Sequence, residues 1–120
     1  MILAALLLFG QAPSLNPPTD WTPLPRLQLG LAAAPPVQLT EFVRREVAAE
    51  RCALSPTERM LDLVVLVTQG GQVRRIVPRA IGCPSIEQFA AGIVLRAARD
   101  KTRPGSIDTW YVTTVALTSP

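Results

Sequence analysis

The sequence contains no histidine, the side chain that proteins most often use as a general base and as a metal ligand. Its absence excludes Ser-His and Cys-His nucleophile pairs. With two cysteines and no histidine, the chain also lacks the ligands of a usual four-ligand zinc site. We therefore expect a protein that is not an enzyme, with no catalytic residue, no cofactor and no metal site.

Aromatic residues are scarce, at 5% of the 120 residues, and Lys101 is the one lysine. Nucleic-acid-binding surfaces combine clustered positive charge with aromatic side chains that stack on bases. The net charge of +3 is mild and is carried almost wholly by arginine, so we expect no nucleic-acid partner. The apolar fraction of 48% is enough for a core of Val, Leu, Ile and Ala.

The apolar run from Ile2 to Phe9 is short of the roughly 20 apolar residues that span a bilayer. Its length is typical of a signal-peptide core, with Gly10 and Ala12 as small residues at a cleavage site. We assign residues 1–12 as a signal peptide and expect a periplasmic or secreted protein. The alternative is an apolar tail with no targeting role.

Prolines are concentrated before residue 40, where seven of the 12 occur. Proline fixes φ and favours an extended chain, so we interpret residues 13–36 as a Pro-rich arm or linker. Residues 37–120 are then one folded domain. Within the arm, Trp21 and the run Arg26–Leu31 are candidates for a short strand against the domain, which the sequence leaves open.

The domain is predicted to begin with a helix over Glu41–Cys52 that is capped by Thr40. Phe42, Val43 and Val47 give this helix an apolar side. Its charged residues are predicted to be mostly solvated: Arg44, Arg45, Glu46, Glu50 and Arg51.

A β-hairpin is predicted next, with a strand over Leu61–Thr68 and a return strand over Val73–Pro78. Gly70 and Gly71 tolerate positive φ and mark the turn. Val73 and Ile76 are an odd number of residues apart, so strict alternation would place them on opposite faces. A bulge at Arg74-Arg75 would put both inward and turn the arginines out.

A second helix is predicted to follow, capped by Ser85 in a capping box with Gln88. The small residues Ala91, Gly92 and Ala98 are predicted to let this helix lie close to the sheet. A last strand is predicted over Asp108–Thr118. The predicted class is α+β: a small antiparallel sheet (strand, strand, helix, strand) with helices on one face, preceded by an N-terminal helix.

Cys52 and Cys83 are predicted to form a disulfide, because paired cysteines in exported chains are usually bridged. The alternative is two unpaired thiols in a cytosolic protein. Arg74, Arg75 and Arg79 form a candidate basic patch for an acidic partner. The alternative for the patch is a solvated face that keeps the protein in solution.

The run from about Met60 to Leu117 resembles the C-terminal domain of TonB-family energy transducers. The resemblance is carried by "LVVLVTQGGQVRRIVP", "SIEQFAAGIVLRAAR", "TRPGS" and "WYVTTVALT". It covers about half of the chain. Among the departures from the family, the chain has no histidine and its apolar run is too short for the family's membrane anchor. We therefore expect an exported relative with the family's fold.

The resemblance implies a binding module of the cell envelope that adds an extended segment of a protein partner to a sheet edge. An outer-membrane protein is the partner class that it suggests. The candidate contact residues are those of the last strand: Trp110, Tyr111, Val112, Thr113 and Thr114.

Two further hypotheses stay open. One is a small envelope enzyme or inhibitor that uses a carboxylate such as Asp62 or Asp108. The other is a structural accessory that docks to an envelope complex through Val64 and Leu66. The sequence leaves the oligomeric state open.

Overall fold

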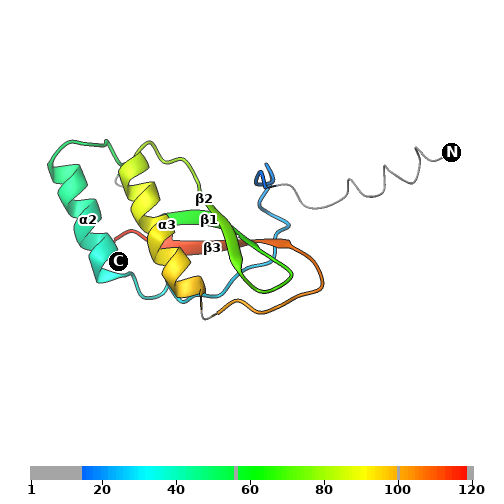
Figure 1. Ribbon diagram of the computed structural model, residues 1–120. Helices are drawn as coiled ribbons and strands as arrows, with labels where there is room; N and C mark the ends of the chain where they lie inside the picture. The colour runs from blue at the N-terminus through cyan, green and yellow to red at the C-terminus, as the bar shows by residue number, and fades with distance from the viewer. Residues whose placement is uncertain (1–14, 56, 100, 119–120) are drawn as a thin grey trace.

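The computed structural model describes residues 15–55, 57–99 and 101–118, so the predicted signal peptide lies outside the described residues. Figure 1 shows two helices lying on one side of a three-stranded sheet. The predicted α+β class is confirmed. The elements are α2 (Val37–Ala48), β1 (Met60–Val67), β2 (Val73–Pro78), α3 (Pro84–Ala98) and β3 (Thr109–Ala116).

The sheet has the order β2-β1-β3, and both neighbours of the central strand are antiparallel to it. Leu66 pairs with Arg75 and Val67 pairs with Val73, so Arg74 is an extra residue on β2. This is the predicted bulge. It lets Val73 and Ile76 both pack against the core on the helix side, while the two arginines are exposed.

The main core lies between the sheet and the helices. Alternate residues of β1 point into it, as period-two alternation predicts: Leu61, Leu63, Val65 and Val67. The helix α3 contributes Ile86, Ala90, Ile93, Val94 and Ala98. The two helices also contact each other, with the rings of Phe42 and Phe89 stacked at a centroid distance of 4.3 Å.

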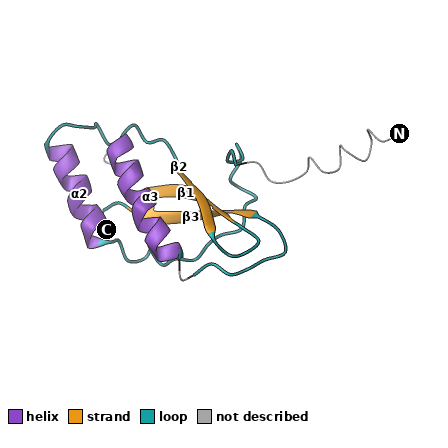
Figure 2. Cartoon of the chain, in the orientation of Figure 1, coloured by secondary structure: helices purple, strands orange, loops and turns teal. Residues whose placement is uncertain are grey.

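The opposite face of the sheet is covered by the Pro-rich segment rather than by a helix. Val64, Leu66, Trp110 and Val112 are buried there, and Trp21 and Leu24 are among the residues packed against them. Figure 2 shows this irregular segment running past the sheet to the start of α2. The segment is therefore part of the fold and forms a third layer.

The first helix begins four residues earlier than predicted, at Val37, and ends at Ala48. Thr40 is not its cap, because its hydroxyl lies inside the first turn and donates to the Pro36 carbonyl at 2.7 Å. The earlier start makes Leu39 the first core residue, and the buried positions then follow at Val43 and Glu46. The predictions of a solvated Glu46 and an inward Val47 are therefore wrong, and Val47 is exposed.

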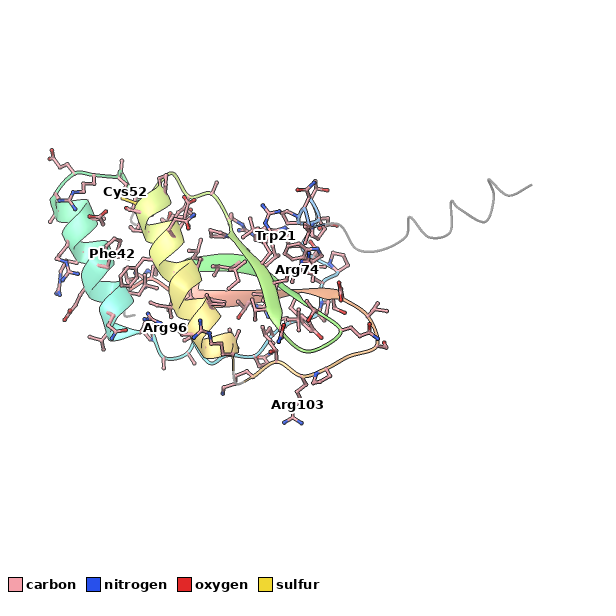
Figure 3. The ribbon with its side chains drawn as sticks, in the orientation of Figure 1. Trp21, Phe42, Cys52, Arg74, Arg96 and Arg103 are labelled. Carbon is pink, nitrogen blue, oxygen red and sulfur yellow. A yellow bond between two sulfur atoms is a disulfide. The ribbon has the colours of Figure 1, made fainter. Side chains whose placement is uncertain are left out.

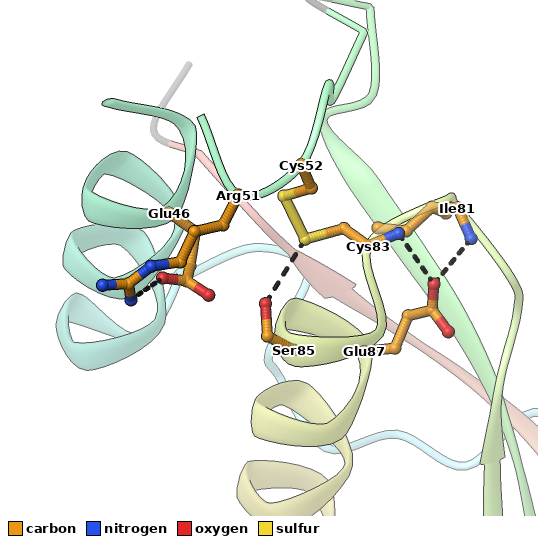
Figure 4. The surroundings of a disulfide bond; sticks show 7 residues. All are labelled: Glu46, Arg51, Cys52, Ile81, Cys83, Ser85 and Glu87. Carbon is orange, nitrogen blue, oxygen red and sulfur yellow. Dashed lines mark hydrogen bonds and ion pairs between the residues drawn. A yellow bond between two sulfur atoms is a disulfide. The ribbon is translucent and has the colours of Figure 1, made fainter. Parts of the chain in front are cut away.

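The second helix also begins earlier than predicted, with Cys83 before the first turn and Pro84 at the first helical position. Ser85 is therefore inside the helix and does not cap it. Figure 4 shows the replacement: the Glu87 carboxylate accepts from the backbone N–H of Ile81 at 3.0 Å and of Cys83 at 3.2 Å. These bonds satisfy donors that precede the helix.

The hairpin turn lies against the loop that follows α3. Gly71 has φ +84°, and a Cβ added to it would lie 2.8 Å from the Pro104 nitrogen. The carbonyl of Gly71 also accepts from the Thr102 hydroxyl at 2.5 Å. Gly70 differs, since its nearest such neighbour is Thr68 Oγ1 at 3.7 Å and its φ is not positive.

We expect Gly71→Ala to lower the free energy of unfolding by more than the about 1–2 kcal/mol that left-handed backbone costs an alanine, because the Pro104 backbone must also shift. The adjacent Gly70→Ala should change it by less than about 0.5 kcal/mol. Urea denaturation of both variants measures the difference. Equal losses would contradict a specific need for glycine at residue 71.

Candidate functional site

The outer edge of β3, the predicted partner edge, is paired with the chain's own N-terminal segment. The Leu27 N–H donates to the Val112 carbonyl at 2.9 Å, and the Val112 N–H donates to the Pro25 carbonyl at 3.0 Å. Further along, the Ala116 N–H donates to the Leu31 carbonyl at 3.0 Å. Arg26 and Val112 form a parallel bridge. Residues 25–31 therefore occupy the place that a partner strand was predicted to take.

Side chains hold the same segment in place. The Thr113 hydroxyl donates to the Leu27 carbonyl at 2.9 Å, and Arg26 donates to Thr114 Oγ1 at 2.6 Å. Thr114 in turn donates to an Asp62 carboxylate oxygen at 2.6 Å.

The five predicted contact residues lie on one strand, but they are inside the fold. Trp110, Val112 and Thr113 are buried, whereas Tyr111 and Thr114 are half-buried. The prediction is corrected in this respect: the edge exists, but a partner would have to displace residues 25–31 to reach it. Nothing in the composition of the last strand indicated this pairing.

The outer edge of β2 is the one that the described residues leave unpaired. The Arg79 N–H donates to the Asp62 carbonyl at 2.9 Å, and Val64 pairs with Val77. Backbone groups of a strand point alternately to its two sides. The N–H and carbonyl of Ile76 therefore point away from β1. No backbone group in the described ranges bonds to this side of β2.

The predicted basic patch lies at this edge, and its three arginines are all exposed. Arg75 donates to the Leu15 carbonyl at 2.5 Å. Arg79 pairs with Asp62 at 3.0 Å and lies over the Trp21 ring at 5.6 Å from its centroid. Arg74, the bulged residue, points outward from the strand. Arg75 and Arg79 thus contact the N-terminal segment, whereas Arg74 lies at the open edge of β2.

The two candidate catalytic carboxylates are far apart. Asp62 is opposite Thr114, whereas Asp108 precedes Thr109, which is opposite Val67. At about 3.3 Å per residue, the two lie roughly 20 Å apart. Each has a structural contact: Asp62 binds Thr114 and Arg79, and Asp108 accepts from the Gln69 N–H at 2.8 Å.

The described residues also give no support to a docking surface at Val64 and Leu66 or to a metal site. Val64 and Leu66, the proposed docking residues, are 0% and 1% exposed beneath the N-terminal segment. Within residues 15–55, 57–99 and 101–118, no group of His, Cys, Asp and Glu side chains is placed to hold a metal ion.

The predicted disulfide between Cys52 and Cys83 is confirmed, with the two Cα atoms 5.2 Å apart. It joins the segment after α2 to the start of α3, as Figure 4 shows. The two cysteines are 31 residues apart in the sequence. Closing a loop of this length lowers the conformational entropy of the unfolded chain, which raises the free energy of unfolding by about 3–4 kcal/mol in the loop-entropy model. The bridge thus holds together the two helices that cover the main core.

Glu46 lies beside the disulfide, at 3% exposure. A hydrogen bond with the Ser85 side chain is the main cause that holds the pKa of the Glu46 carboxyl below its usual value. Arg51, whose guanidinium lies 2.8 Å from the carboxylate, lowers the same pKa further, whereas burial opposes both effects. The carboxylate therefore links α2, the following turn and the start of α3.

Comparison with known proteins gives no match to a family model, to a curated protein or to a solved structure. The TonB-family resemblance therefore stays a prediction. Neither helix in the described part of the chain is long and apolar enough to cross a bilayer. The disulfide is compatible with a non-cytoplasmic protein.

We expect Glu46→Gln to make the protein less sensitive to acid. A carboxyl whose pKa is lower in the folded state stabilises the fold above its unfolded pKa, near 4.5, and this contribution is lost as the pH falls through the folded value. Urea denaturation between pH 6 and pH 3 measures the difference in stability between the wild-type protein and the variant. This difference should shrink as the pH falls.

The matched control is Glu41→Gln, which removes an exposed carboxylate from the same helix. Its stability difference from the wild-type protein should be nearly constant over the same range. A constant difference for Glu46→Gln as well would refute the linkage.

Proposed function

We propose that this protein is a non-catalytic binding module of the cell envelope, periplasmic or secreted, that binds a protein partner by sheet-edge pairing. The observation that carries this proposal is the state of the two edges. One edge already holds an extended segment through backbone hydrogen bonds, and the other has backbone groups that no described residue pairs with. Sheet-edge addition uses this chemistry, in which main-chain bonds give the affinity.

The location in the envelope is supported by the disulfide, since such bonds persist mainly in oxidising compartments. It is also supported by the apolar N-terminal run that we predict to be a signal peptide. The resemblance to the TonB C-terminal domain adds the expectation of an outer-membrane protein as partner.

The open edge of β2 is the favoured place for the partner. A segment that bound at β3 would first have to break the three backbone bonds to residues 25–31 and uncover part of the second core. A segment that bound at β2 would pair with groups that now face outward. Exposed edges are also a hazard, which proteins usually suppress with charge, bulges or proline. β2 carries all three features, which oppose indiscriminate pairing and leave the backbone of Ile76 accessible to a matching segment.

The alternative functions have less support. A carboxylate enzyme would need Asp62 or Asp108 available for chemistry, yet both carboxylates hold parts of the fold together. An accessory that docks through Val64 and Leu66 would need those side chains on the surface, and both are covered.

The test is a pair of variants at one residue. Ile76→Pro removes the outward N–H, whereas Ile76→Ala shortens the same side chain and keeps the N–H. Immobilised wild-type protein is incubated with an envelope extract of its native host, and the partners retained are quantified. The two variants are immobilised and tested in the same way. We expect Ile76→Ala to retain the partner and Ile76→Pro to bind it at least about tenfold more weakly, which is the change in affinity that one hydrogen bond of about 1.4 kcal/mol gives.

Circular dichroism and thermal denaturation show whether the two variants keep the fold to the same extent. Equal retention by two folded variants would contradict pairing at β2.

A further inference from the structure

A groove runs beside the open edge of β2, between this strand and α3. Its hollow of about 420 Å³ is lined by residues 73–76 of β2 and by Gln88, Ala91, Gly92 and Leu95 of α3. A second hollow of about 310 Å³ shares Val73 and Leu95 with the first, and it adds Arg99 and the hairpin turn. The shared residues make the two hollows one continuous groove along the strand.

The helical side of the groove is a regular stripe. Its residues recur at the three- and four-residue spacing of one helix face: Gln88, Ala91, Gly92, Leu95 and Arg99. Gly92 is exposed, and a Cβ added to it would meet no heavy atom within 4 Å. The prediction that Gly92 lets α3 lie close to the sheet is therefore wrong, since it faces the groove.

This glycine has no role in the packing that the structure shows. Glycine within a helix is less stable than alanine, and here the free protein has room for the larger side chain. Its missing side chain leaves the middle of the groove open. A second backbone could approach the helix there.

The charge of the groove has one sign. Arg74, Arg75 and Arg99 line it, and the described residues that line the two hollows include no Asp or Glu. A second copy of this chain that paired edge to edge through β2 would bring like charges together, which is unfavourable. A partner segment with carboxylates would instead be attracted.

We propose that the groove binds an extended acidic segment of the partner protein. This inference rests on the proposed function, and it adds the chemical class of the partner. The segment lies as a fourth strand, about 4.8 Å from β2, and pairs with the outward N–H and carbonyl of Ile76. Alternate small or apolar side chains face Ala91 and Gly92, and the carboxylates between them point to the other face, toward Arg74 and Arg75.

The probe is a fluorescein-labelled heptapeptide, Thr-Val-Glu-Val-Glu-Val-Thr, and its partner probe has lysine in place of both glutamates. Fluorescence anisotropy with the full chain at low ionic strength measures both dissociation constants. We expect the acidic peptide to bind at least tenfold more tightly than the basic one, and salt to weaken its binding.

Two sets of variants test the residues of the groove. Arg74→Gln with Arg75→Gln should weaken the binding of the acidic peptide about tenfold. Arg44→Gln with Arg103→Gln is the control, because it removes the same charge elsewhere: Arg44 lies on α2, and Figure 3 shows Arg103 directed away from the fold. Gly92→Leu should block binding without lowering the thermal midpoint of the free protein, a combination that misfolding would not produce.

The outcomes separate this inference from the proposed function. Equal affinity for the two peptides, with both sensitive to Ile76→Pro, would overturn the acidic class and keep sheet-edge pairing. Acidic binding that Ile76→Pro and Gly92→Leu leave unchanged would overturn the groove. Failure of the acidic peptide to bind at 1 mM, while the envelope partner is retained in an Ile76-dependent way, would also overturn the acidic class.

Discussion

The backbone bonds between Val112 and the segment at Pro25 and Leu27 are the constraint on which the rest of the structure depends. A three-stranded sheet has two faces and two edges, and the helices cover only one face. The N-terminal segment closes one edge and brings Trp21 and Leu24 over the second face. The residues that the structure describes thus cover three of these four surfaces, and they leave the outer edge of β2 open.

The features at the remaining edge agree with one another. The bulge at Arg74 turns charge outward, which prevents indiscriminate strand pairing, while the backbone beyond it stays accessible. The stripe on α3 leaves space at Gly92, where the helix itself would be more stable with alanine. The disulfide and the Glu46 contacts hold α3 against α2, so one wall of the groove is fixed before a partner arrives.

Local patterns predicted the parts of the fold that depend on local chemistry. The hairpin, its bulge and the core face of β1 follow from alternation and from the spacing of Val73 and Ile76. The run Arg26–Leu31 alternates leucine with other residues, as a strand would, and the sequence offered it as a candidate strand. Its pairing with β3 could not be predicted, because it joins positions more than 80 residues apart and a local pattern does not specify the partner strand. The burial of Glu46 likewise depends on Arg51 and Ser85, which only the folded chain brings to it.

Hydrogen exchange at single amides of the free protein, measured by NMR, tests directly whether the β3 edge is closed and the β2 edge is open. We expect slow exchange at Val112 and Leu27, which donate across the closed edge, and fast exchange at Ile76, although it lies in the middle of a strand. Strong protection of Ile76 in the monomeric protein would show that its edge is already paired. Fast exchange at Val112 and Leu27 would show that the N-terminal segment does not close the β3 edge. Either result would contradict a sheet with one closed edge and one open edge.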